Sequence, residues 1–589
     1  MDRKSLLLLG MVLCLTARSV WAEEDLSSYY PAQTAIYVEL SEPGELADDL
    51  RSRPEAKAIA KKLKVVPAVA QALESQKYRE FQTGMTILEL GWGKPWYDVI
   101  SSVAHNGVSF GFDPQVGGFV VIARAHEDAD LHRIVRTVVV TAAADAARKK
   151  KPNPFKESEY RGMTVFEGPG IGIGVHDGKL VVTNNLEMGR SVLDALLDGR
   201  ADSLREQSRF QQALESRHAD GLAWSYFDVE YFRSKHPDED LYKNRAQDPG
   251  GELILGGILS ALFQTPYATG EVLRDGRRIT LGFDAPFERA GIEEEREHFF
   301  GPDGAGEAAV PVNVPRQMLG LSVYRDLSQM WLRSGDLFDE KSNNELNKAE
   351  TGLSTLFSGR SFSEEVLGSL SPRIQLVVAR QEYAEGHTPA LKLPAFALIA
   401  EMKDPKKTKR DFRRNFVNAI GFFNIAGATK GAPQLELDFS GAEGMELVSA
   451  SPIVEVDEQT DEPGGIHYNF SPSMAFADSW MIIASTSQLA QDIATAHTQE
   501  VAEGTSRTQE RTNTVIELSL DPVIQILQEN RDHLISQNML KEGHTREEAE
   551  ADIDSMLGVG QLVEHGELKL STTPETIRLQ LVIDLHRPE

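Results

Sequence analysis

The chain of 589 residues contains a single cysteine, Cys14, and that residue lies near its start. Arg3 and Lys4 precede a short apolar stretch over residues 6–17, and Ala22 is a small residue at the expected cleavage point. This is the pattern of a secretory signal peptide over residues 1–22. We therefore expect an exported protein, periplasmic or secreted, that has lost its thiol. Such a protein has no disulfide, no cysteine-ligated metal and no cysteine nucleophile.

A lipid anchor and a membrane span are also missing from the pattern. Leu13 precedes Cys14, where a lipid-attachment site requires a small residue. The longest later apolar stretch, residues 253–263, contains Gly256 and Gly257 and is shorter than the ~20 residues that span a bilayer. We predict a core helix there and no transmembrane segment after the signal.

Positive charge is scarce, because 61 Lys and Arg stand against 89 Asp and Glu, for a net charge of −28. Such a chain repels nucleic-acid phosphates and anionic lipid headgroups, so we expect no nucleic-acid partner. The hydrophobic content of 41% is ordinary for a folded protein. The length suggests two to four domains.

The two halves of the chain repeat the same order of predicted elements. Four pairs of segments match in order: 35–40 with 319–324, 119–123 with 396–400, 177–183 with 478–484, and 227–229 with 520–522. The first three pairs predict strands that precede helices, and each half closes on alternating strands. This order predicts an internal duplication.

We therefore predict an α+β fold of two duplicated halves, made mainly of antiparallel sheets with helices packed on one face. The halves cover residues 23–290 and 311–589. Residues 291–310 combine a charge run with glycine and proline, which predicts a linker. Asp177 and Gly178 predict a hairpin turn in the first half.

The first half also contains a familiar succession of segments. It opens on Tyr30-Pro31-Ala32-Gln33-Thr34, continues through predicted strands at 160–165 and 177–182, and has a predicted helix at 187–197. Over roughly residues 29–285, and more faintly in the second half, the chain resembles bacterial envelope proteins grouped as domain-of-unknown-function family 3352. The resemblance implies an envelope location and this type of fold. It implies no activity, because the family has none established.

Gly107, Ser109 and Gly111 match the Gly-x-Ser-x-Gly pattern of serine hydrolases. In those enzymes the serine stands on a sharp turn from a strand to a helix. Here residues 112–118 predict a turn into another strand, 119–123. We therefore expect Ser109 to lie within a strand.

The segment 168–174 is rich in glycine, at Gly168, Gly170, Gly172 and Gly174. A phosphate-binding loop would open a helix whose amide groups face the phosphate. A hairpin follows instead, and neither nucleotide-binding spacing of glycines occurs in this sequence. Close backbone packing in a strand is the favoured interpretation.

His126, Asp128, Asp130 and His132 fall within seven residues, and two imidazoles with a carboxylate suit zinc. The predicted helix start weakens this hypothesis, because Asp128 or Asp130 is better placed as its N-cap. At the other end of that helix, the lysines at 149–151 are expected to complement the helix dipole rather than to form a basic patch.

Two remaining patterns receive no role. Asn469 begins a glycosylation sequon that Pro472 follows, and Asp238, Glu239 and Asp240 are expected in a solvated loop. We therefore assign no catalytic, cofactor-binding or metal-binding residue and expect no cofactor. The sequence favours a non-catalytic exported binding or interaction protein, with another protein or a small apolar ligand as partner. The alternatives are a secreted hydrolase, using Ser109 or a carboxylate pair, and a carrier of a lipid-like ligand.

Overall fold

The computed structural model describes residues 25–41, 43, 76–235, 246–287, 294–304, 306–384, 387–429, 433–442, 444–453, 465–503, 512–573 and 575–586. The predicted signal peptide and the acidic residues Asp238, Glu239 and Asp240 lie outside these ranges.

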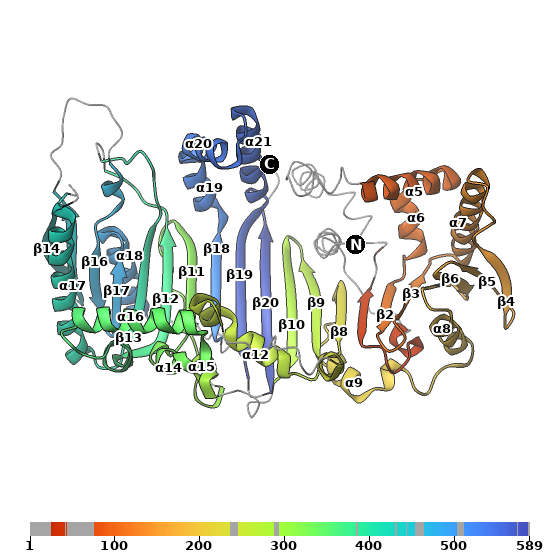
Figure 1. The fold of residues 1–589 in the computed structure, drawn as a ribbon, viewed down its shortest axis with the longest axis horizontal. Helices are drawn as coiled ribbons and strands as arrows, with labels where there is room; N and C mark the ends of the chain where they lie inside the picture. The colour runs from red at the N-terminus through yellow and green to blue at the C-terminus, as the bar shows by residue number, and fades with distance from the viewer. Residues whose placement is uncertain are drawn as a thin grey trace. The chain divides into compact units, whose positions relative to one another are not determined.

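The chain forms two compact units (Figure 1). The first comprises Met1–Pro237, Thr265–Pro286 and Asp584–Glu589, and the second comprises Asp238–Gln264 and Phe287–Ile583. Within the described ranges, no helix has the length and apolarity needed to cross a membrane.

The first unit is built on one antiparallel sheet. Its strands are β1 (Ile36–Leu40), β2 (Val108–Asp113), β3 (Gly118–Arg124), β4 (Lys156–Tyr160), β5 (Met163–Gly168), β6 (Ile171–His176), β7 (Lys179–Thr183), β8 (Ala223–Phe227), β9 (Ala268–Asp275) and β10 (Arg278–Pro286). They pair in the order β10-β9-β8-β1-β2-β3-β7-β6-β5-β4. The helices are α5 (Gln76–Trp92), α6 (Trp96–Val103), α7 (Asp128–Arg148), α8 (Leu186–Asp198), α9 (Ser208–Leu214) and α10 (Val229–Lys235).

The second unit contains a sheet of the same kind. Its strands are β11 (Gln317–Tyr324), β12 (Leu370–Ala379), β13 (Ala395–Met402), β14 (Leu435–Ala442), β15 (Met445–Pro452), β16 (Ser473–Ala477), β17 (Trp480–Ala484), β18 (Thr514–Ser519), β19 (Val563–Thr572) and β20 (Thr576–Leu585). They pair in the order β20-β19-β18-β11-β12-β13-β17-β16-β15-β14. The longer helices are α12 (Gly257–Gln264), α16 (Glu340–Leu356), α17 (Pro405–Ala428), α18 (Ser487–Glu503), α19 (Leu520–Glu529), α20 (Arg531–Glu542) and α21 (Arg546–Gly560).

The predicted α+β class with antiparallel sheets is confirmed, and the two units share one strand order. Each strand of the second unit holds the place of the strand numbered ten lower in the first. The pairing register agrees as well. Ile36 lies opposite Phe112 and Phe227, and Leu319 lies opposite Val378 and Leu518.

Equivalent backbone contacts recur around the two hairpins that carry β7 and β17. The Phe119 N–H donates to the side-chain oxygen of Asn184 at 2.6 Å, and the Phe396 N–H donates to the hydroxyl of Ser485 at 2.9 Å. Next to the hairpin turns, Ala125 N–H donates to the Gly178 carbonyl at 3.0 Å. Met402 N–H makes the corresponding bond to the Ser479 carbonyl at 2.8 Å.

The prediction that helices pack on one face of the sheet is wrong. On one face of β3, Val120 and Ile122 pack with Val192 of α8, and on the other face Ala123 packs with Leu131 of α7. Helices α18 and α17 divide between the two faces of β13 in the same way. Successive strand residues point to opposite faces, so an unbroken apolar run such as 119–123 needs cover on both.

Residues 294–304, within the predicted linker, are folded into the second unit. Phe299 and Phe300 are fully buried and pack with Ile258 of α12. The guanidinium of Arg325 lies 3.5 Å from the centre of the Phe299 ring. The two phenylalanines after the charge run therefore act as core residues. The apolar stretch 253–263 is helical, as predicted.

Candidate functional site

Ser109 is the second residue of β2 and is buried, so it lies within a strand, as the sequence predicted. Its hydroxyl is 2.8 Å from the Tyr30 hydroxyl. Burial raises the pKa of Tyr30 well above its ordinary value of 10, so this phenol does not act as a base near neutral pH. No imidazole of the described residues hydrogen-bonds to Ser109. The arrangement lacks the nucleophile-base contact that a serine hydrolase needs.

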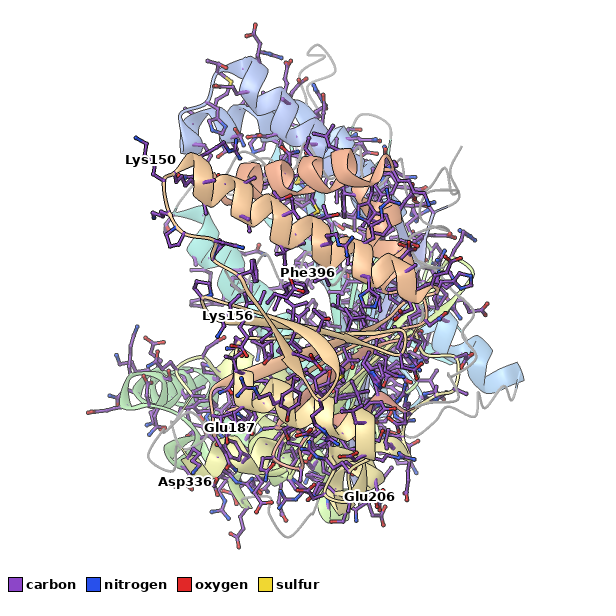
Figure 2. The ribbon with its side chains drawn as sticks, turned by 90° about the vertical axis from the view of Figure 1, so that its right-hand side faces the viewer. Lys150, Lys156, Glu187, Glu206, Asp336 and Phe396 are labelled. Carbon is purple, nitrogen blue, oxygen red and sulfur yellow. The ribbon has the colours of Figure 1, made fainter. Side chains whose placement is uncertain are left out.

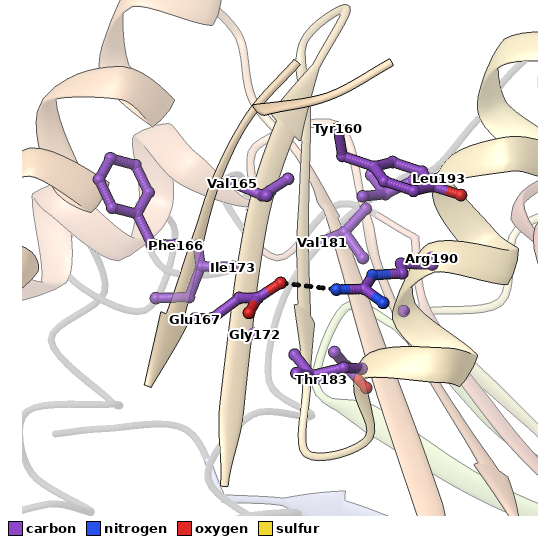
Figure 3. A pocket seen from close by; sticks show the side chains of 13 residues that line it. Tyr160, Val165, Phe166, Glu167, Gly172, Ile173, Val181, Thr183, Arg190 and Leu193 are labelled. Atoms are coloured by element: carbon purple, nitrogen blue, oxygen red, sulfur yellow. Dashed lines mark hydrogen bonds and ion pairs between the residues drawn. The ribbon is translucent and has the colours of Figure 1, made fainter. Parts of the chain in front are cut away.

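The glycine-rich segment is the hairpin of β5 and β6, and helix α8 packs against it. A Cβ added at Gly172 would lie 2.7 Å from Leu186, and one at Gly174 would lie 3.3 Å from Leu193. The hollow between hairpin and helix has a volume of about 30 Å³, and the Glu167–Arg190 ion pair of 2.8 Å crosses it (Figure 3). That volume is about the share of one water molecule. The glycines therefore permit helix packing and leave no room for a nucleotide.

The four metal-candidate side chains do not converge. Asp128 accepts a hydrogen bond from the Gly178 N–H at 3.0 Å and lies 3.2 Å from His132. His126 instead packs edge-on against His105. Among the described residues no cluster of three or more metal-ligating side chains occurs. The N-cap of α7 is Glu127 rather than Asp128 or Asp130, because Asp128 already belongs to the first helical turn and holds the hairpin.

The lysines at 149–151 close α7, as Figure 2 shows for Lys150. Lys149 is the C-cap residue, and its ammonium pairs with Asp145 at 2.6 Å. Lys150 has a left-handed backbone with φ of 53°. Cations at this end oppose the negative pole of the helix.

Asn469 of the sequon is completely buried. Its side-chain amide donates to the carbonyls of Leu391 and Ile466 at 2.9 and 3.1 Å. Its side-chain oxygen accepts from the Leu393 N–H and the Tyr383 hydroxyl, both at 2.8 Å. Asn469 is thus a structural hub in which all side-chain polar groups are used.

The first unit contains a buried acidic pair that the sequence analysis missed. Glu39 of β1 and Glu271 of β9 both lie opposite Trp224 of β8, on the core face of the sheet. Glu39 accepts a bond from the Tyr37 hydroxyl at 2.8 Å and pairs with Arg217 at 3.3 Å. The strand pattern concealed this pair, because the polar Glu39 alternates with apolar neighbours and so seemed to face solvent.

The second carboxylate of this pair also has hydrogen-bond partners. Glu271 accepts from the His218 backbone N–H at 2.8 Å, and its other oxygen lies 2.5 Å from His218 Nδ1. Arg217 and His218 are consecutive, so the two carboxylates fix the loop that follows α9 to the sheet. With Trp224 buried between them, the carboxylates have no access to a substrate. The cluster is a structural ionic network.

The opposite face of the same sheet is apolar and only half-buried. One row of directly paired residues crosses four strands: Phe227, Ile36, Phe112 and Phe119. We call the first apolar face the set Ile36, Val38, Phe110, Phe112, Phe119, Val121, Val182 and Phe227.

The second unit repeats this feature in the equivalent rows. The second apolar face comprises Leu319, Leu321, Leu376, Val378, Phe396, Leu398, Ile483, Ile516 and Leu518. Phe396 is 51% exposed and Leu398 is 44% exposed. The exposed part of an antiparallel sheet normally carries polar residues. Here the side chains beyond the part that α17 covers are apolar and remain exposed.

A larger hollow of about 440 Å³ lies elsewhere in the second unit, beside the start of α18. Its cations already have partners: Arg316 pairs with Glu382 at 2.8 Å, and Arg380 pairs with Glu529. A ligand here would have to displace these ion pairs. We therefore regard the hollow as a weaker candidate for ligand binding than the second apolar face.

Comparisons with known proteins identify no relative by sequence: no family model matches the chain, and no curated protein is similar to it. Two crystal forms of TP0453, forms I and III, are similar in structure, with TM-scores of 0.24 and 0.25 and sequence identities of 10% and 9%. The alignments cover 46% of this chain and 82% and 83% of that chain. A likeness at this level identifies no shared function.

Proposed function

We propose that the chain is an exported, non-catalytic binding protein that holds a small apolar ligand on the second apolar face. The observation that supports this most is the cross-strand row Leu321, Leu376, Leu398 and Ile483, in which Leu398 and Ile483 are exposed on the paired strands β13 and β17. Contiguous apolar patches are uncommon on soluble proteins unless they bind something.

Covering the face has a clear driving force. Each Å² of apolar surface removed from water contributes about 25 cal/mol, so covering half-exposed Phe396 and Leu398 favours association without a polar contact. The paired rows carry no charged side chain that would select a polar ligand. A hydrocarbon chain laid across the strands matches this surface, which also supports the carrier alternative.

The hydrolase alternative has less support. Ser109 is buried beside a protonated phenol, and the carboxylates of Glu39 and Glu271 are paired and closed off from solvent. Neither arrangement offers a nucleophile or a general base to a substrate.

We also propose that the two units arose by duplication of one α+β half. The shared strand order and register support this, as does the repeated contact of Phe119 with Asn184 and of Phe396 with Ser485. Membership of the envelope family that the first half resembles is part of the same proposal.

Export is proposed from the leader pattern alone. Mass spectrometry of the protein from its native source should give an N-terminus at Glu23. A mature protein that still contains Cys14 would contradict export by signal cleavage.

Binding of a fluorescent polyene fatty acid to the full-length protein tests the proposed ligand site. Leu398→Gln places a polar group in the middle of the face and should weaken binding about tenfold. Leu540→Gln is the matched control, because Leu540 is 81% exposed on α20 and lies outside the face. Equal affinity of the Leu398→Gln variant and the wild type, or no binding by the wild type, would contradict the proposal.

A further inference from the structure

The second unit contains a polar hollow beside the start of helix α17. Its volume is about 300 Å³, and its walls come from the end of α16, the short helix η8 (Phe362–Val366) and the first three turns of α17. All its lining residues fall between positions 357 and 415, so it lies within one unit. This volume is sufficient for a small molecule such as a free amino acid.

Helices α7 and α17 hold equivalent places in the two units. Helix α7 begins at Asp128 and α17 begins at Pro405, at the same distance along the chain from the equivalent residues Phe119 and Phe396. The residues of α17 can therefore be compared with those of α7 position by position.

The side of the helix that faces the polar hollow is apolar in α7. There Leu131 and Ile134 pack in an apolar cluster with Val103 at the end of α6. Thr408 and Asp411 stand at these two positions of α17, on one side of the helix, and line the polar hollow. Polar side chains at a packed helix face lower stability unless they have polar partners. A polar ligand would supply such partners.

Asn415 continues this polar side of α17 by one turn. Its side chain lines the polar hollow and is only 5% exposed, and its side-chain oxygen accepts no hydrogen bond from the described residues. Val138 holds the equivalent place on α7. A buried acceptor without a donor is unfavourable. Because a half-turn of the amide exchanges its oxygen and nitrogen, Asn415 can offer a ligand either an acceptor or a donor.

Opposite charges reach the polar hollow from two different elements. Lys403 and Lys407 lie at the start of α17, and Glu364 and Glu365 lie on η8. The ammonium group of Lys403 donates to the Gly368 carbonyl at 3.0 Å. Neither Lys407 nor Glu364 has an ion-pair partner among the described residues.

The remaining charges of the polar hollow have partners within it. Arg360 lies 3.2 Å from Asp411 and 3.7 Å from Glu365. Asp404 is the N-cap of α17 and accepts from the Lys407 N–H. The positive pole of α17 favours an anionic group at the lysine end. A cationic end at α17 and an anionic end at η8 are the pattern that a zwitterion requires.

We infer that the polar hollow binds a free apolar α-amino acid, with its carboxylate toward Lys407 and its ammonium group toward Glu364. The rings of Phe357 and Phe412 also line the hollow, with their centres 5.9 Å apart, and offer contact to an apolar side chain. Asn415 accepts a hydrogen bond from the ammonium group. The inference uses none of the residues of the second apolar face and does not depend on the ligand proposed there.

Isothermal titration calorimetry of the protein with L-leucine tests this inference. N-acetyl-L-leucinamide has the same side chain without the two charges and should bind at least about tenfold more weakly than L-leucine. Lys407→Gln and Glu364→Gln should each lower the affinity for L-leucine at least about tenfold. Lys406→Gln is the matched control, because Lys406 is an exposed neighbour of Lys407 that does not line the hollow.

Two further variants separate binding from structure. Asn415→Val gives α17 the residue type that α7 has, so it should weaken L-leucine binding without lowering the melting temperature of the ligand-free protein. A lowered melting temperature with unchanged affinity would show a purely structural role for Asn415. Leu398→Gln, on the second apolar face, should bind L-leucine as the wild type does.

Several results would overturn the inference. They are no binding of L-leucine by the wild type, equal affinity for N-acetyl-L-leucinamide, and unchanged affinity in both charge variants. Loss of L-leucine binding in Leu398→Gln would place the amino acid on the second apolar face instead. Binding of D-glucose in the absence of L-leucine binding would show that the hollow recognises a neutral polyol, and would overturn the inference as well.

Discussion

Asp177 and Asp478 have the same left-handed backbone conformation, with φ of 45° and 46°, in two hairpins of equivalent position. A side chain with a Cβ is strained there, although aspartate tolerates this region better than most residues. We expect Asp177→Ala and Asp478→Ala each to lower the free energy of unfolding by about 1 kcal/mol. Differential scanning calorimetry measures both.

The glycine variants supply the control for this prediction. Asp177→Gly and Asp478→Gly remove the strain and should change stability by less than about 0.5 kcal/mol. A cost at one hairpin without a matching cost at the other would contradict the structural equivalence of the two turns.

Removal of the Asn469 side chain should be costly. Asn469→Ala leaves the Leu393 N–H and the Leu391 carbonyl without this partner, while the Tyr383 hydroxyl keeps its bond to the Leu393 carbonyl at 3.2 Å. Each unpaired buried group costs about 1–3 kcal/mol, so we expect a loss of at least about 2 kcal/mol. Thermal unfolding checks this, and Asn418→Ala on the exposed side of α17 is the control. A loss no larger than that of the control would show that the hydrogen bonds of Asn469 do not stabilise the fold.

His497 should contribute to acid sensitivity. Burial against the Trp480 ring lowers the pKa of His497 to about 4 from its ordinary value of 6.5, and nearby Asp478 opposes the shift. Between these two values the unfolded chain binds the proton more readily, so stability is full near pH 7 and falls as the pH drops from 6.5 towards 4.

The pH prediction is tested by His497→Phe, which keeps an aromatic ring beside Trp480 and removes the titration. From a pKa of about 4 against 6.5, the wild type should lose on the order of 3 kcal/mol more than the variant on acidification. Thermal melts between pH 7 and pH 4 measure the difference. Parallel pH profiles would contradict the prediction.

The buried pair of Glu39 and Arg217 should behave as a coupled unit. Arg217→Met leaves a buried, uncompensated carboxylate and should cost about 3 kcal/mol or more. The double variant Glu39→Met/Arg217→Met removes both charges and should be less destabilised than the single variant. A double-mutant cycle by urea unfolding measures the coupling, and additive losses would show that the pair is independent.

Local sequence predicted much of the fold because strand and turn signals are local. The match of residues 119–123 with 396–400 and of Asp177 with Asp478 agrees with the observed register exactly at those positions. The match at 35–40 is displaced by one residue, since Ile36 rather than Ala35 holds the place of Leu319. Strand ends are less constrained than turns, which explains this slip.

The apolar faces were harder to predict, because they depend on which face of each strand is covered by other residues. Alternation in β1 suggests that Tyr37 and Glu39 face solvent, yet they form the core side with Trp224 and Arg217. The apolar residues Ile36 and Val38 lie on the half-exposed side. The long-range pairing of β1 with β2 and β8 determines which face of β1 is buried. No single segment of the sequence determines that pairing.

Native mass spectrometry of the protein, purified gently from its native source, tests most directly whether the second apolar face holds a ligand. We expect a mass increment from a small apolar molecule in the wild type. The increment should persist in the Leu540→Gln variant and fall clearly in abundance in the Leu398→Gln variant. A wild-type protein of bare polypeptide mass, or an increment that Leu398→Gln leaves unchanged, would contradict the account.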